Sequence, residues 1–298
     1  METHAMRRME DRRTMIAAAL MIIAQASGPV AVQAMPDPEP VRYADPPDLV
    51  LGLDADEIEA VPYFNGLLLR TALRNSSDGS YAAKVTFLAD EKMGSGPIGR
   101  DYHIYVLEGE MRFGEVTLGQ GDLAYLPQGT DVGGLSGTVG TTYLMFGRAK
   151  RKEPVAAGEA VFVRAADVEW RKGTVAAAGG ADAELLIKPL WTDAETGARV
   201  HLVKIAPGVT VPWEIHPSAE EGYLLEGDYK LAECLPSGRR DYSYNEGGYF
   251  YRPGGVMHSG PDSFTSTGAT WLIRTPAELT ALFYPSCPAA PALEETQP

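Results

Sequence analysis

Short apolar runs, separated by Gly, Asn, Asp and Pro, follow one another from about Val61 onward. Apolar runs of about four to eight residues between such turn residues are typical of β-strands. Residues 81–87 and 199–205 are two of the runs that this pattern predicts to be strands. No long segment in this region carries the 3.6-residue apolar period of an amphipathic helix. The pattern therefore predicts an all-β protein, built as a sandwich or a barrel.

The pattern of strands and turns occurs twice along the chain. Residues 67–87 resemble residues 185–205, with an offset of 118 residues. The offset rises to 126 between residues 121–129 and 247–255, where the second copy has a longer hairpin. Self-similarity at a nearly constant offset indicates two tandem copies of one folding unit.

The start of the chain has a different composition. Four arginines precede the apolar run 15–26, and Val32-Gln33-Ala34 offers small residues for cleavage. This order is typical of a secretory signal peptide, and the apolar run is too short for an ordinary membrane span. We therefore expect residues 1–34 to be a signal peptide and the mature protein to be periplasmic or secreted. A short hydrophobic helix or a lone anchor is the alternative.

The remaining chain divides by composition. Five prolines between residues 36 and 47 exclude regular structure there, and a short basic run begins at Arg148. The expected order is an extended lead-in (35–60), a first barrel (61–147), a charged connector (148–168), a second barrel (169–284) and a Pro/Ala-rich tail (285–298).

The charge of the chain is strongly acidic. There are 26 basic and 40 acidic residues, and loss of the leader would leave 22 and 37, a net charge of −15. Such an excess argues against nucleic acid and against anionic membranes as partners of the mature protein.

The chain has two cysteines. Cys234 lies in a predicted hairpin and Cys287 in the tail. Export would permit a disulfide, which would pin the tail to the second barrel. The sequence leaves open whether the two sulfur atoms lie within bonding range.

Histidines and glutamates gather in one part of the second copy. Glu214 and His216 are two residues apart on a predicted strand, so their side chains point to the same face. A proline break then lets the next strand bring Glu220 or Glu221 to that place. The spacing to Gly227 favours Glu220, and Glu221 would then face the opposite side of the strand. A Pro-Gly-Gly turn can direct His258 inward as well. Four such donors, converging inside a small barrel, would form a metal site.

These residues resemble the two signature motifs of the cupin superfamily. The first motif is G-x5-H-x-H-x3-E-x6-G, and the chain matches it with glutamate in place of the first histidine at Gly208, Glu214, His216, Glu220 and Gly227. The second is G-x5-P-x-G-x2-H, which is matched without a change at Gly247, Pro253, Gly255 and His258. The resemblance implies two tandem cupin barrels, each a double-stranded β-helix or jelly roll, with one divalent metal held by the motif residues. The second copy also resembles the cupin domain of zinc-binding anti-sigma factors.

The first copy keeps most turn residues but loses the donors. The positions that match the four donors hold Gly96, Ile98, Tyr102 and Val132. His103 in this copy is interpreted as a structural or substrate-pocket histidine. His201, on the strand before the first motif, is interpreted as a hydrogen-bonded strand histidine. Metal binding is therefore expected only in the second barrel.

The donor set suggests which metals fit. Two imidazoles and one or two carboxylates suit Fe(II), Mn(II), Ni(II) or Zn(II), and the additional carboxylate favours iron or manganese. Glu214 is expected either to ligate the metal or to act as a catalytic general base beside it. Arg252 could pair with a carboxylated ligand, although we expect it at the surface.

The resemblance implies metal-dependent chemistry on a small organic molecule, and we favour a dioxygenase-like oxidoreductase. A non-catalytic, metal-dependent binding or sensing module is the alternative, and a purely structural secreted β-protein ranks last. The cupin fold by itself does not choose among these functions. The sequence also leaves open whether the barrels pair across a homodimer.

Overall fold

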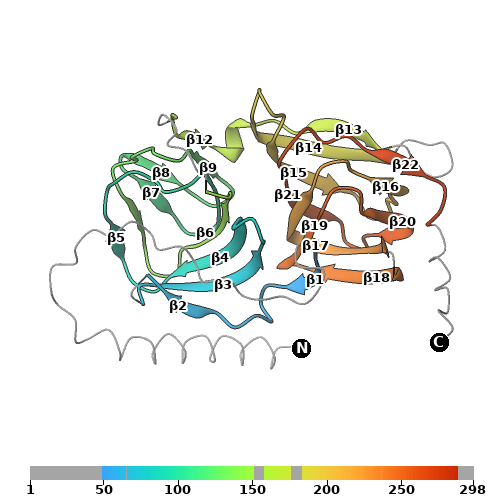
Figure 1. Ribbon diagram of the computed structural model, residues 1–298, viewed down its shortest axis with the longest axis horizontal. Helices are drawn as coiled ribbons and strands as arrows, with labels where there is room; N and C mark the ends of the chain where they lie inside the picture. Colours follow the sequence, from blue (N-terminus) through green and yellow to red (C-terminus); the bar gives the residue numbers. More distant parts are fainter. Residues whose placement is uncertain (1–48, 65, 151–157, 176–182, 236, 288–298) are drawn as a thin grey trace, which may run out of the picture. The chain divides into compact units, whose positions relative to one another are not determined.

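The protein is built almost entirely of β-strands, as Figure 1 shows. The computed structural model describes residues 49–64, 66–150, 158–175, 183–235 and 237–287. The expected signal peptide, most of the lead-in and most of the tail lie outside these ranges. Among the described residues the one helical element is a single 3₁₀ turn, η1 (Ala165–Asp167). The all-β prediction is confirmed, and no described helix has the length and hydropathy to cross a bilayer.

The chain forms two compact units. The first contains Ala60–Ala72 and Ala82–Phe162, and the second contains Leu73–Tyr81, Val163–Pro298 and the described part of Val41–Glu59. The two units correspond broadly to the two copies of the sequence repeat.

The first unit contains a long and a short sheet. The seven strands of the long sheet are, in spatial order, β12 (Val161–Val163), β9 (Leu123–Leu126), β6 (Tyr102–Glu108), β11 (Thr142–Gly147), β4 (Tyr81–Phe87), β3 (Leu68–Asn75) and β2 (Val61–Tyr63). The short sheet has the order β5 (Glu91–Met93), β10 (Leu135–Gly137), β7 (Met111–Phe113) and β8 (Val116–Leu118). Leu68, Val85, Phe113, Leu123 and Leu144 are fully buried, because alternate residues of each strand face the interior.

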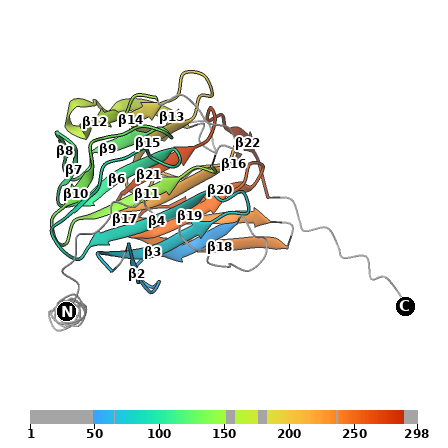
Figure 2. The same ribbon diagram turned by 60° about the vertical axis from the view of Figure 1, so that its left-hand side comes forward.

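The second unit contains the donors. Its main strand path is β13 (Arg171–Val175), β14 (Ala183–Thr192), β15 (Arg199–Ile205), β21 (Ala269–Thr275), β17 (Glu220–Leu235), β20 (Met257–Phe264), β16 (Trp213–Ile215) and β22 (Leu282–Tyr284). Two further strands, β18 (Gly238–Asn245) and β19 (Gly248–Arg252), pair with β17. Figure 2 gives a second view of these strands.

The long strand β17 joins the two sheets of the second unit. Its first half pairs with β19 and β21, and its second half pairs with β18 and β20. Gly227, at the change of sheet, has φ 86°, a conformation that favours glycine. A Cβ at this position would lie 1.8 Å from the carbonyl oxygen of Gly268. The glycine of the first motif is therefore required for close packing as well as for its backbone angle.

Gly227→Ala is expected to destabilise the protein more than Gly208→Ala. Both glycines have positive φ, but a Cβ at Gly208 would meet no atom within 4 Å. Gly208→Ala should cost about 1–2 kcal/mol of unfolding free energy, from the backbone angle alone. Gly227→Ala should cost about 1–3 kcal/mol more, because the added methyl group overpacks the turn. Urea unfolding of the two variants measures the difference, and equal losses would contradict it.

The structure adds a strand within the stretch expected to be an extended lead-in. β1 (Val50–Asp54) pairs antiparallel with β19, with Val50 opposite Tyr251 and Leu53 opposite Tyr249. Figure 1 shows β1 in blue beside the orange strands of the second unit. Residues that precede the first copy in sequence thus complete a sheet of the second.

The two cysteines form a disulfide. Cys234 is on β17 and Cys287 follows β22, and their Cα atoms are 5.7 Å apart. The question that the sequence left open is thereby answered, and the end of the described chain is tied to the second unit.

Candidate metal centre

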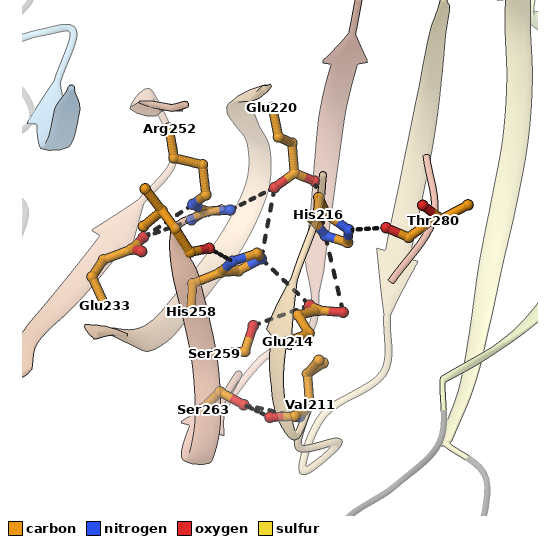
Figure 3. A network of polar contacts seen from close by, with 11 residues as sticks. Val211, Glu214, His216, Glu220, Glu233, Arg252, His258, Ser259, Ser263 and Thr280 are labelled. Carbon is orange, nitrogen blue, oxygen red and sulfur yellow. Dashed lines mark hydrogen bonds and ion pairs between the residues drawn. The ribbon is translucent and has the colours of Figure 1, made fainter. Parts of the chain in front are cut away.

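The four expected donors come from three neighbouring strands. Glu214 lies on β16 and His216 directly after it, Glu220 begins β17, and His258 lies on β20. Glu214 is the direct cross-strand partner of His258, so their side chains lie on the same face of the sheet. Figure 3 shows all four side chains directed toward one another.

The distances place both carboxylates within reach of both imidazoles. His258 Nε2 lies 3.5 Å from Glu214 Oε1 and 3.7 Å from Glu220 Oε2. His216 Nε2 lies 4.0 Å from Glu214 Oε2 and 3.9 Å from Glu220 Oε1. The side chains of His216, Glu220 and His258 are buried, and that of Glu214 is partly buried, with 12% of its surface exposed. The structure therefore brings all four predicted residues together.

Hydrogen bonds orient both imidazole rings. His216 Nδ1 lies 2.9 Å from the carbonyl oxygen of Thr280, and His258 Nδ1 lies 3.1 Å from that of Val256. A carbonyl oxygen only accepts, so we assign the proton of each ring to Nδ1. Each Nε2 then presents a lone pair to the two carboxylates, as in the histidine ligands of metal sites.

The donor set fits a divalent cation. In the described part of the chain, no hydrogen-bond donor reaches the two Nε2 atoms, Glu214 Oε2 or Glu220 Oε1. Two ligands of one such cation are at most about 4.4 Å apart, because each lies about 2.0–2.2 Å from it, and the distances above lie below this limit. Three of the residues, Glu214, His216 and His258, have ligand atoms that all lie within 4.8 Å of one another, and Glu220 is outside this group.

Neighbouring charges separate the charge states of the two glutamates, because burial raises the pKa of both. Burial raises the pKa of Glu214 to about 7, although His216 opposes the shift. Burial also acts on Glu220, but His216 and Arg252 outweigh it and hold the pKa of this carboxyl well below its usual value. Burial and Arg252 lower the pKa of His258 well below its ordinary value. Near neutral pH, Glu220 is thus an anion and His258 is neutral, while Glu214 can take up or release a proton.

Arg252 pairs with Glu220, one of the expected ligands, and with the buried Glu233. Its Nη1 donates to Glu220 Oε2 at 2.6 Å, and its Nη2 donates to Glu233 Oε1 at 2.8 Å. We expected Arg252 at the surface, but it is only 3% exposed. It is buried because the inward-facing carboxylates need a cation to balance their charge. No sequence spacing indicated this partnership.

Glu221 faces away from the centre, as strand alternation requires. Its carboxylate accepts hydrogen bonds from Arg74, Tyr249 and Arg274, and the Tyr249 bond is 2.8 Å long. Burial opposes ionisation, but the two arginines lower the pKa of Glu221 below its usual value. This geometry agrees with the expectation that Glu220, and not Glu221, faces the centre.

His201 lies closer to the centre than its place in the sequence suggests. It is 4% exposed on β15, and its Nδ1 has no hydrogen-bond partner among the described residues. Burial lowers the pKa of His201 to about 4, and the charges of Glu220 and His216 also act on it. The expected hydrogen bond is therefore not seen at this nitrogen.

Comparisons with known proteins identify a family domain and the fold of this chain. Residues 159–277 match the family model of the ChrR cupin-like domain. No curated protein matches the chain.

Two solved structures have the same fold. A "putative dioxygenase" from Nostoc punctiforme PCC 73102 is 19% identical, with a TM-score of 0.62 over 78% of this chain and 85% of that chain. An oxalate decarboxylase variant from Bacillus subtilis is 13% identical, with a TM-score of 0.56 over 83% of this chain and 81% of that chain. At these identities the similarity shows the fold alone.

The family match covers the unit that holds the donors, and the structural matches extend over both units. Together with the two motifs and the jelly-roll arrangement of strands, they show that residues 159–277 form a ChrR cupin-like domain and that the two units have the cupin fold.

Proposed function

We propose that the second unit binds one divalent transition metal through His216, His258, Glu220 and Glu214, with iron or manganese favoured over zinc or nickel. The observation that carries this proposal is the convergence of two Nε2 lone pairs and two carboxylates. A bound metal of this kind acts as a Lewis acid that holds and polarises an enolate, diol or carboxylate.

The residues around the centre have separable roles in this proposal. Arg252 keeps Glu220 ionised and in place, and the carbonyl groups of Thr280 and Val256 keep both imidazole rings in position. Glu214 has a pKa near 7 and is the most exposed donor. It is therefore suited to accept a proton from a bound substrate whenever it is not itself a ligand. The Ser259 hydroxyl donates to Glu214 Oε1 at 3.3 Å and orients it.

We further propose that this site catalyses a dioxygenase-like oxidation of a small organic molecule. Both atoms of dioxygen would enter the substrate, so no other reductant is needed. Two histidines with a carboxylate form a ligand set that non-haem iron oxygenases use. The fold similarity to a "putative dioxygenase" is consistent with the proposal.

Oxygen uptake tests this function. Protein loaded with Fe(II) is expected to consume one dioxygen per substrate with one class among β-diketones, catechols, flavonols and thiols, and the product should gain two oxygen atoms. Glu214→Gln should reduce the rate by about 100-fold or more if Glu214 is the general base. Metal-loaded protein that consumes no oxygen with any class would contradict the proposal.

A binding or sensing module is the second candidate. It is favoured by the match of residues 159–277 to the ChrR cupin-like domain, which covers all four expected donors. This function predicts that the metal-loaded protein binds a ligand from the same panel and releases it unchanged. Calorimetric binding together with mass spectrometry of the ligand separates the two candidates.

We also propose that the protein is exported. The disulfide between Cys234 and Cys287 is of a kind that persists in oxidising compartments. A mature protein that begins near residue 35, as measured by mass spectrometry, would support export. An uncleaved chain recovered from the cytoplasm would contradict it.

A further inference from the structure

After β21 the chain returns across the metal centre as a segment that we name the C-terminal strap, residues 280–287. Within it, β22 pairs antiparallel with β16, and Phe283 is the direct partner of Glu214. Figure 1 shows β22 in dark red next to β16. The strap therefore forms the edge of the sheet, next to the strand that carries Glu214, one of the expected metal ligands.

The strap also orients a second expected ligand. The main-chain carbonyl of Thr280 accepts the hydrogen bond of His216 Nδ1 at 2.9 Å, from 64 residues further along the chain, as Figure 3 shows. The corresponding bond of His258 goes to Val256, only two residues away. The orientation of His258 is thus secured locally, whereas that of His216 depends on where the strap lies.

Side-chain packing holds the strap weakly. Leu282, Phe283 and Tyr284 are 52%, 41% and 39% exposed, so the strand buries little apolar surface of its own. A segment with few buried contacts opens more easily than the core of its domain. The strong attachment is the disulfide of Cys287 to Cys234, and Cys234 is the cross-strand partner of Met257, the neighbour of His258.

We propose that the strap is a positioning element of the metal centre and that the disulfide couples thiol redox state to metal affinity. This inference rests on the proposed metal function. With the disulfide intact, Thr280 stays against His216 and the site binds its metal tightly. Both cysteines are partly exposed, so a soluble dithiol can reach the bond. Reduction breaks the S–S bond with two electrons and two protons to give two thiols, while the dithiol becomes a disulfide. The released strap then leaves His216 without its acceptor.

The first test compares oxidised wild type with the double variant Cys234→Ser and Cys287→Ser. Zn(II) affinity, measured by competition with a chromophoric chelator, is expected to fall by about 10–100-fold, the usual effect of losing a partner of a metal-binding histidine. Serine avoids the new thiolate ligands that chemical reduction would create. An unchanged affinity would overturn the proposal.

The second test reads the two histidines directly in the metal-free protein. In side-chain nitrogen NMR, His216 should lose its fixed Nδ1–H tautomer in the double variant while His258 keeps its own, and the wild type reduced with a phosphine should behave likewise. Loss at both histidines would indicate general unfolding and would overturn the proposal, as would retention at both. If the oxidised wild type binds no metal, the proposed function fails, while this NMR comparison still decides whether the strap positions His216.

Discussion

Replacing His258 with alanine is expected to weaken metal binding by more than about 100-fold, because even the loss of a partner that orients a ligand costs about 10–100-fold. His258 Nε2 is the atom that approaches both carboxylates most closely, at 3.5 Å and 3.7 Å. Without it, the cation would lose one of its two imidazole ligands. The same loss is expected for His216→Ala. Elemental analysis after dialysis, followed by competition titration, measures both effects.

His103→Ala provides the matched control. His103 is as buried as His258, at 2% against 3%, and stacks on Tyr125 with ring centroids 4.9 Å apart. The first unit has no group of potential metal ligands among its described residues. This variant should therefore keep the metal content of the wild type, although it loses packing. Full metal content in His258→Ala, or an equal loss in His103→Ala, would contradict the assignment of the site.

Replacing Arg252 with methionine is expected to lower the free energy of unfolding by about 3–5 kcal/mol, the usual cost of removing one partner of a buried ion pair. Glu233 is completely buried and Glu220 nearly so, and both accept hydrogen bonds from this guanidinium. Methionine would also contact the ring of Phe250, over which the guanidinium now lies at 3.8 Å. The loss is therefore expected from the two unpaired carboxylates rather than from packing. Chemical unfolding at neutral pH measures it.

The pH dependence of the Arg252→Met variant distinguishes this cause from simple loss of packing. Without the arginine, the buried carboxyl groups should remain protonated to a higher pH in the folded state than in the unfolded state. The folded state then binds more protons, so the stability of the variant relative to wild type should fall as the pH rises above about 4.5. A loss of stability that is the same at pH 5 and pH 8 would contradict the explanation.

Arg239→Met is the control for this substitution. Arg239 is 37% exposed, and it pairs with Asp241 and Asp262 at 2.7 Å each. An exposed ion pair of this kind contributes about 0–1 kcal/mol. Arg239→Met is therefore expected to lower the free energy of unfolding much less than Arg252→Met, and equal losses would contradict the dependence on burial.

Both units keep glycines at matching turns, but only the second unit has the four expected donors. Gly109 and Gly121 of the first unit have positive φ, as do Gly227 and Gly247 of the second. The turns depend on these backbone angles, and both copies retain them. The donor positions face the interior and do not set the path of the backbone, so Ile98 can replace a histidine without disturbing the turns. A functional centre in one unit alone is therefore compatible with similar folds in both.

Several parts of the site could be predicted from local pattern. Glu214 and His216 lie on one predicted strand, and the structure brings both to the centre. Side chains two residues apart on a strand point to the same face of the sheet. The spacing to Gly227 favours Glu220 over Glu221, and the two carboxylates do belong to different networks. The turn before His258 was visible from its proline and glycines.

Other parts could not be predicted, because they depend on contacts between distant segments. The burial of Arg252 follows from two inward-facing carboxylates, one of them 32 residues away. The pairing of β1 with β19 joins two strands that lie about 200 residues apart in the sequence, with most of the first unit between them. Neither contact produces a periodic signal in the sequence, because each partner has its own local pattern and only the fold brings them together.

The sequence by itself determined the all-β class, the two copies and the four side chains that converge, because strand alternation and glycine turns are local properties of the chain. Only the tertiary structure decided which charges are balanced in the interior, which carbonyl group orients each histidine and which sulfur atoms join. Those features require atoms far apart in the chain to lie within a few ångströms of each other, and burial then sets their energies.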